Sequence, residues 1–294
     1  MVTVYVNGSS AGTPPGKNDH LRAKRDVVKG WSPGAVRRHT RWLQSMDADA
    51  LAVGSVGWAI TLTMRDCPES ADELHALRRA WIRRVTRAGA ERIHWVIEWQ
   101  RRGVPHIHAA AYWPEGHPNA EHGAALAIFA WTAVAEPYVA TMSAQHYDSI
   151  DGALGWLKYL SKHAARGARH YQRSGHPEGW SRTGRLWGHT GEWPVLPPLK
   201  FSVEKQAGFR YRRLVRSWRV ADARKDLVRA RARHDETLVD LALSRLVFAR
   251  HMLRCNDRNL SEVRGVSDWI PEAVNIDLLM SLRDQGYYVE QVAE

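Results

Sequence analysis

The sequence predicts an α+β fold: an antiparallel sheet in β-α-β-β-α-β order with an added helix, followed by a helical region. β-rich segments alternate with amphipathic helical segments between residues 30 and 206, and two of the β-rich segments are separated only by a short turn. Beyond about residue 207 the pattern becomes helical and strongly basic. We therefore expect a flexible tail at 1–29, an α+β domain at 30–206 and a basic helical region at 207–294.

The first half of the α+β domain has clear signals for the ends of its elements. A helix begins in "GWSPGAVRRHTRWLQSM", with Ser32 as N-cap and Pro33 at the first helical position. The segment "GWAITLTM" at 57–64 predicts a buried strand. A second amphipathic helix, "SADELHALRRAWIRRVTRAG", is capped by Ser70 and ends at Gly89.

The second half begins with a pair of strands, at 92–99 and 104–113. A helix in "NAEHGAALAIFAWTAVA", a strand in "ATMSAQHYDSI" and a helix in "DGALGWLKYLSKHAAR" follow. A loop rich in Gly, Arg and Trp then leads to a last strand, "LKFSVEK". Helical patterns continue through "RYRRLVRSWRVADARKDLVRARAR", "TLVDLALSRLVFARHMLR" and "WIPEAVNIDLLMSLRDQ".

The composition indicates a protein that meets a polyanion. The formal net charge is +11, and arginine supplies 34 of the 42 cationic side chains. This favours nucleic acid as the partner, although membrane-surface binding or solubility alone would also suit such a charge. Arginine makes bidentate contacts with phosphate, and the 14 tryptophans are more often core residues than platforms for bases. Only two cysteines occur, which excludes a disulfide framework and a cysteine-based zinc site.

The sequence gives no sign of a membrane segment or of a nucleotide-driven motor. No apolar run approaches the ~20 residues of a membrane span, and the first residues lack the pattern of a signal peptide. We therefore expect a cytoplasmic protein. The glycine-rich G-x-x-x-x-G-K-[ST] motif of P-loop enzymes does not occur.

Two histidines in the strand pair, His106 and His108, share one face because alternate residues of a strand point to the same side. Such a pair is by itself more often incidental than metal-binding. If Arg101–Gly103 form a three-residue loop, with Gly103 in the left-handed conformation, Glu98 lies opposite His106 on the same face. Two imidazoles and a carboxylate then suit a divalent ion such as Mn²⁺ or Mg²⁺. A four-residue loop would break this site.

The helix after the last of these strands offers a nucleophile. Its apolar stripe consists of Ala153, Leu157, Leu160 and Ala164. Tyr159 lies about 200° around the helix from Leu157, at about 100° per residue. Lys162, one turn on, shares the face of Tyr159. The alternative is that Tyr159 only extends an apolar stripe that begins at Trp156.

Three motifs occur in order along the chain: "TLT" at 61–63, "PHIH" at 105–108 and "YLSK" at 159–162. Together they resemble the three motifs of rolling-circle replication initiators of the HUH endonuclease superfamily. Glu98 stands eight residues before the first histidine, where many such initiators carry a carboxylate ligand. "GWSPGAVRRHTRWLQSMDADAL" and "GRLWG" resemble flanking segments of bacterial plasmid and phage members, so that the resemblance covers about residues 28–205.

The resemblance implies a ferredoxin-like (RRM-like) antiparallel sheet with flanking helices, and an endonuclease that cuts one DNA strand at an origin. Tyr159 would attack the scissile phosphate, keep the 5′ phosphate and later allow rejoining. Glu98, His106 and His108 would hold the metal ion, while Lys162 would orient the phosphate or assist proton transfer. The residues expected to contact DNA are Thr61, Thr63, Arg101, Arg102, Lys158, Arg166 and Arg169.

The partners follow from the same resemblance. Single-stranded DNA, including an origin hairpin, is the implied substrate, and the missing P-loop implies a host helicase that acts in trans. The protein would be bacterial, encoded by a plasmid or phage. The arginine-rich segment 210–233 is expected to bind DNA independently of sequence, and self-association of the C-terminal helices is also compatible with the pattern.

Several alternatives stay open at this point. Tyr147 and Tyr171 are rivals or helpers of Tyr159, because no second tyrosine lies one turn from it. A transposase or a relaxase of the same superfamily would share the chemistry. A basic sheet protein that binds nucleic acid without cutting it is the alternative outside enzymes.

Overall fold

The computed structural model describes residues 1–12, 27–161, 171–174, 176–254 and 269–292. The chain divides into two compact units, which are Ala23–Val195 and the combination of Met1–Arg22 with Leu196–Glu294. Both units contain an antiparallel sheet, so the protein is a mixed α+β structure. No helix in the described part of the chain is long and apolar enough to span a membrane.

The unit Ala23–Val195 is built on a five-stranded sheet with the order β6-β3-β5-β4-β7, in which every neighbouring pair is antiparallel. Its strands are β3 (Ser55–Leu62), β4 (Arg92–Trp99), β5 (Pro105–Pro114), β6 (His146–Ser149) and β7 (Trp187–Thr190). Its helices are α1 (Pro33–Gln44), α2 (Ala48–Ala52), α3 (Ala71–Arg87), α4 (Gly123–Val134), α5 (Ala153–Leu160) and α6 (Tyr171–Ser174), with 3₁₀ turns η2 (Glu136–Tyr138) and η3 (Met142–Ala144).

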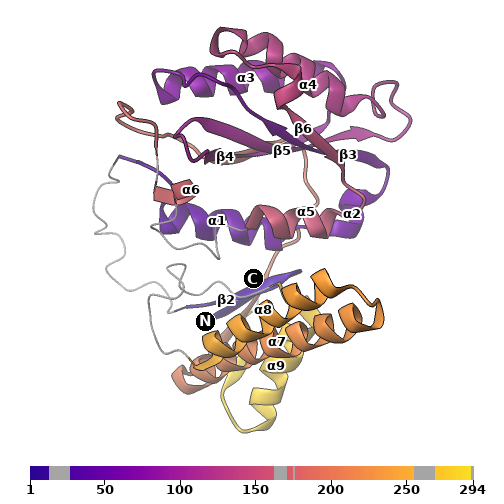
Figure 1. Ribbon diagram of the computed structural model, residues 1–294. Helices are drawn as coiled ribbons and strands as arrows, with labels where there is room; N and C mark the ends of the chain where they lie inside the picture. The colour runs from indigo at the N-terminus through magenta and orange to yellow at the C-terminus, as the bar shows by residue number, and fades with distance from the viewer. Residues whose placement is uncertain (13–26, 162–170, 175, 255–268, 293–294) are drawn as a thin grey trace. The chain divides into compact units, whose positions relative to one another are not determined.

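The sheet of this unit lies between two layers of helices. Helices α3 and α4 cover one face, and α1, α2 and α5 cover the other (Figure 1). Along the chain, β3-α3-β4-β5-α4-β6 follows the predicted β-α-β-β-α-β order, and the sheet adds β7 at its edge beside β4. The face that meets α1 and α5 carries the candidate site described below.

The ends of the helices follow the predicted local signals. Ser32 is the N-cap of α1, where its hydroxyl oxygen accepts a hydrogen bond from the backbone N–H of Ala35 at 3.2 Å, and Pro33 takes the first position. Ser70 caps α3 in the same way, and Gly89 follows its last turn with φ +101°.

Large aromatic side chains fill the core between the sheet and the layer of α3 and α4. Trp81, Trp99, Trp113 and Trp131 are among the largest fully buried side chains. The Trp81 indole donates a hydrogen bond to the Ala127 carbonyl at 2.9 Å, which joins α3 to α4. These tryptophans therefore serve packing, which agrees with the greater burial tendency of the residue type.

The second unit has a four-stranded antiparallel sheet with the order β2-β1-β8-β9. Its elements are β1 (Val2–Tyr5), β2 (Gly8–Ala11), β8 (Leu199–Val203), α7 (Lys205–Ala232), α8 (Glu236–Arg254), α9 (Glu272–Asp284) and β9 (Val289–Val292). A cluster that includes Val2, Val4, Phe201 and Leu279 forms its core. Helices α7 and α8 pack through a separate stripe, which includes Leu227 and Leu246.

Three sequence-based predictions need correction here. Residues 2–11, expected to be part of a flexible tail, form the β1–β2 hairpin, because Val2 and Val4 are buried against the strand β8. The strand in "LKFSVEK" belongs to this second sheet, whereas the fifth strand of the first sheet is β7, within the segment interpreted as a loop. The compact units therefore divide at residues 195 and 196, and the predicted division at 206 falls inside the second unit.

Candidate metal centre and tyrosine

The β4–β5 hairpin places the candidate ligands by its register. The backbone N–H of Gln100 donates to the Val104 carbonyl at 2.9 Å, which leaves the three residues 101–103 as the loop. Gly103 has φ +83°, the left-handed conformation that this loop requires. Glu98 then pairs directly with His106, as the sequence predicts.

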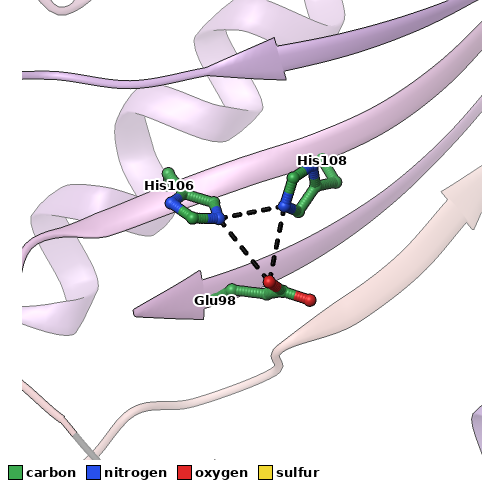
Figure 2. A group of neighbouring side chains, drawn as sticks. All are labelled: Glu98, His106 and His108. Atoms are coloured by element: carbon green, nitrogen blue, oxygen red, sulfur yellow. Dashed lines mark hydrogen bonds and ion pairs between the residues drawn. The ribbon is translucent and has the colours of Figure 1, made fainter. Parts of the chain in front are cut away.

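The side chains of this hairpin converge on one point. Glu98 Oε2 lies 3.6 Å from His106 Nε2 and 3.4 Å from His108 Nε2, and the two Nε2 atoms are 2.9 Å apart. Figure 2 shows both rings turned toward the carboxylate from the neighbouring strand. In the described part of the chain, this is the group whose histidine and carboxylate atoms lie close enough together to hold a metal ion.

The surroundings of the group orient its members. The Glu98 side chain is 0% exposed, and Gln172 Nε2 on α6 donates a hydrogen bond to Glu98 Oε2 at 2.9 Å. His108 Nδ1 lies 3.0 Å from Thr61 Oγ1 on β3. When Nδ1 carries the proton and donates to Thr61, Nε2 presents its lone pair toward Glu98.

This arrangement fits a cation. A carboxylate oxygen and an imidazole lone pair that face each other repel unless a proton or a metal ion lies between them. Burial of a carboxylate is also costly unless opposite charge or hydrogen bonds compensate it. Two nitrogen atoms and one oxygen atom form a donor set that first-row divalent ions accept. Glu98, His106 and His108 can therefore hold a metal ion.

Tyr159 stands beside this group on α5. Ala153, Leu157 and Leu160 are buried, whereas Tyr159 is 45% exposed, so the tyrosine points away from the apolar stripe. Its ring centroid lies 5.7 Å from that of His108, with the two rings nearly perpendicular. The ring of Trp156 stacks on it at 5.3 Å. The structure thus brings the predicted nucleophile to the predicted ligands.

The two rival tyrosines are placed differently. Tyr147 pairs with Ile60, and its ring meets Trp58, whose indole donates to the Ala120 carbonyl before α4. Because His146 pairs with Thr61, His146 faces the metal group and the next residue, Tyr147, faces the opposite side of the sheet. Tyr171 is exposed at the start of α6, next to Gln172 in sequence.

The residues predicted to contact DNA fall into three groups. Thr63 and Arg102 tie the hairpin to β3: Gln100 Nε2 donates to Thr63 Oγ1 at 2.7 Å, and the Arg102 guanidinium donates to the carbonyls of Met64 and Arg65. Arg101 and Lys158 are exposed, and Thr61 orients His108. The predicted residues Lys162, Arg166 and Arg169, and Ala164 of the stripe, lie outside the described residues.

A cleft of about 400 Å³ opens beside Tyr159 and Thr61. It lies between the edge strand β6 and the first turns of α5, and its lining also includes Asp148, Asp151 and Trp156. The sequence analysis assigned no role to these two carboxylates or to Gln172. No sequence signal links Gln172 to Glu98, 74 residues away, because their contact depends on how α6 packs on β4.

A second histidine cluster lies on the same face of the sheet, under α1. His94 on β4 and His39 on α1 are both buried, with their Nε2 atoms 3.1 Å apart. Burial and then the nearby His189 lower the pKa of His94 to about 3. The ring of Trp42 stacks on both His94 and His189. These contacts fasten α1 to the sheet with neutral imidazoles.

Comparison with known proteins decides the family. The model of the family of replication-associated proteins described by ORF2 and the phage gene 2 protein matches residues 57–164, a range that contains the whole metal group and Tyr159. A "Putative replication protein" of Xylella fastidiosa strain 9a5c is 45% identical over 298 residues, which cover 98% of this chain and 98% of that protein. The chain belongs to this family of replication-associated proteins.

Two further members of this group are similar to the chain. A "Putative replication protein" of Xylella fastidiosa strain Temecula1 is 47% identical over 278 residues, with 92% of this chain and 98% of that protein covered. The replication-associated gene 2 protein of Pseudomonas phage Pf3 is 38% identical over 269 residues, with 90% of each chain covered. No solved structure matches the chain at a significant level. The resemblance to plasmid and phage replication initiators is thereby confirmed at the level of the family.

Proposed function

We propose that this replication-associated protein nicks one strand of DNA at a replication origin by tyrosine transesterification, and later rejoins it. One observation carries the proposal: the exposed Tyr159 ring lies 5.7 Å from His108, whose Nε2 atom converges with those of His106 and Glu98. A phenol beside a group that can hold a metal ion is the arrangement that phosphoryl transfer to tyrosine requires. The family and the similarity to the phage Pf3 replication protein support a role at an origin.

The chemistry conserves the number of phosphate ester bonds. The Tyr159 oxygen forms a bond to the scissile phosphorus, and the bond from phosphorus to the 3′ oxygen breaks. The tyrosine loses its proton and the departing 3′ oxygen gains one, so that the products are a 5′-phosphotyrosine ester and a free 3′-hydroxyl. Because the exchange is nearly balanced in energy, the 3′-hydroxyl can reverse it without ATP, which rejoins the strand.

Glu98, His106 and His108 would hold a divalent ion, for which we propose Mn²⁺ or Mg²⁺. The ion would polarise the scissile phosphate as a Lewis acid. Gln172 holds the Glu98 carboxylate, and Thr61 fixes the His108 ring, so both act by orienting ligands. Trp156 stacks on Tyr159 and limits the rotation of its ring, which favours an in-line approach.

Further parts of the proposal concern architecture and partners. The strand order β6-β3-β5-β4 with α3 and α4 on one face supports a ferredoxin-like core. Single-stranded DNA or an origin hairpin is the proposed substrate. Unwinding would come from a helicase in trans, because the sequence contains no P-loop motif. Exposed apolar side chains on α8, such as Val247 and Phe248, are compatible with a homo-oligomer.

The test is a covalent adduct. Wild-type protein, Tyr159→Phe and the matched control Tyr147→Phe are incubated with a library of single-stranded oligonucleotides and Mn²⁺, and adducts are trapped by denaturation and mapped by mass spectrometry. We expect wild type and Tyr147→Phe to carry DNA on Tyr159, and Tyr159→Phe to bind the library without forming an adduct. An adduct mapped to Tyr171, or full adduct formation by Tyr159→Phe, would refute the assignment of the nucleophile.

A further inference from the structure

The cleft beside Tyr159 has a composition that differs from the rest of this basic protein. It is lined by Ala59, Thr61, His146, Asp148, Ser149, Ile150, Asp151, Gly152, Gly155, Trp156 and Tyr159. These lining residues, all within the described part of the chain, include two carboxylates and neither lysine nor arginine, although the net charge is +11. A cleft for phosphate would present cations. This cleft would repel phosphate and accept a group rich in hydrogen-bond donors.

The two carboxylates are aimed into the cleft by the backbone around them. Asp148 pairs with Ala59 on β3, so it shares the face of Thr61 and of the metal group. Its Oδ1 accepts a hydrogen bond from the backbone N–H of Ser149 at 3.0 Å. Asp151 Oδ1 accepts one from Ser149 Oγ at 2.7 Å. Among the described residues, neither belongs to a group that could hold a metal ion. Their orientation is therefore available to a ligand with N–H groups.

The walls of the cleft suit a flat ring. Trp156 and Tyr159 form a stacked aromatic pair on one side. Gly152 and Gly155 leave open space on α5, because a Cβ atom at either position would meet nothing within 4 Å. Aromatic walls with room for a planar group are typical of sites that hold an unstacked nucleobase, whose Watson–Crick edge is then read by polar side chains.

We propose that this cleft binds one unpaired base next to the scissile phosphate and that Asp148 and Asp151 select guanine. Guanine is the base whose Watson–Crick edge places two adjacent donors, N1–H and the N2 amino group, opposite a carboxylate. Adenine and cytosine offer a donor beside an acceptor, and thymine a donor between acceptors. The bound base would hold the adjoining phosphate at Tyr159, so the cleft would set both specificity and alignment. This inference rests on the proposed nicking function.

The experiment uses the full-length protein, Mn²⁺ and single-stranded oligonucleotides with randomised bases. The attached and the released fragments are sequenced for wild type, Asp148→Asn, Asp151→Asn and the control Glu121→Gln, whose exposed carboxylate lies outside the cleft. We expect wild type and the control to prefer guanine at one position that flanks the nick. An amide keeps one acceptor and adds a donor, so at least one Asp→Asn variant should reduce that preference about tenfold and favour adenine or cytosine.

The outcomes separate this proposal from the nicking function. Adducts with no base preference at either flanking position, or with a preference that both Asp→Asn variants retain, would overturn the base-reading cleft and leave nicking intact. The absence of adducts for wild type with every library member would refute the nicking function itself, and the cleft proposal with it. A changed preference at that one position, with unchanged total adduct on the new preferred base, would support both.

Discussion

Replacement of Glu98 by glutamine tests the metal group without a measurement of nicking. Glutamine keeps the shape of the side chain and removes its negative charge. Glu98 Oε2 faces both imidazoles at 3.4–3.6 Å, so an ion held there would lose the carboxylate ligand of the group. Loss of a residue that merely supports a ligand weakens metal affinity by about 10–100-fold. Loss of the ligand itself should therefore cost about 100-fold or more.

The expected magnitude follows from the linkage between binding and folding. At free Mn²⁺ of about 100 times the Kd, binding stabilises the wild-type fold by about 2.7 kcal/mol. A site 100-fold weaker is half filled at the same concentration and contributes about 0.4 kcal/mol. For a unit of this size, 1 kcal/mol shifts the melting temperature by about 2–4 °C. We expect Mn²⁺ to raise Tm by roughly 5–10 °C in wild type and by about 1 °C in Glu98→Gln.

The assay is thermal unfolding followed by tryptophan fluorescence, because 12 of the 14 tryptophans lie in the unit Ala23–Val195. Protein treated with a chelator is compared with and without Mn²⁺. The control Glu91→Gln changes a carboxylate on the surface just before β4 and should keep the full shift. Without metal, Glu98→Gln should be at least as stable as wild type, because a buried charge is removed. Equal Mn²⁺ shifts in wild type and Glu98→Gln would refute the assignment of the ligands.

Three further predictions follow. Gln172→Leu removes the donor to Glu98 and should weaken Mn²⁺ binding about 10–100-fold by calorimetric titration, whereas an unchanged Kd would exclude the orienting role. Arg213→Gln with Arg229→Gln, two exposed positions on α7, should lower the slope of log K against log salt for duplex DNA by about 0.9 each, and an unchanged slope would assign α7 another role. The folded-state pKa of His94, about 3, lies below its unfolded value, so the stability from its neutral form is present above about pH 6.5 and is lost as pH falls toward 3. Urea unfolding at pH 7 and pH 5 should show this loss in wild type and a smaller one in His94→Gln.

The sequence by itself determined the features that depend on short-range geometry. The register of the β4–β5 hairpin follows from the loop 101–103 and the left-handed Gly103, and it brings Glu98 opposite His106 within nine residues of chain. The exposed face of Tyr159 follows from the periodicity of α5 in the same way. These positions are fixed by backbone dihedral angles and side-chain spacing, which neighbouring residues encode.

Only the tertiary structure decided which distant segments complete the site. Gln172 reaches Glu98, Tyr147 faces the far side of the sheet, and β7 pairs with β4, although each lies dozens of residues from its partner. The same holds for Val2 and Val4, whose short strand resembles a tail until β8 covers it. Such pairings depend on which apolar faces the whole chain buries together and on which strand edges remain open, and those choices arise from the sum of many weak contacts rather than from any local pattern.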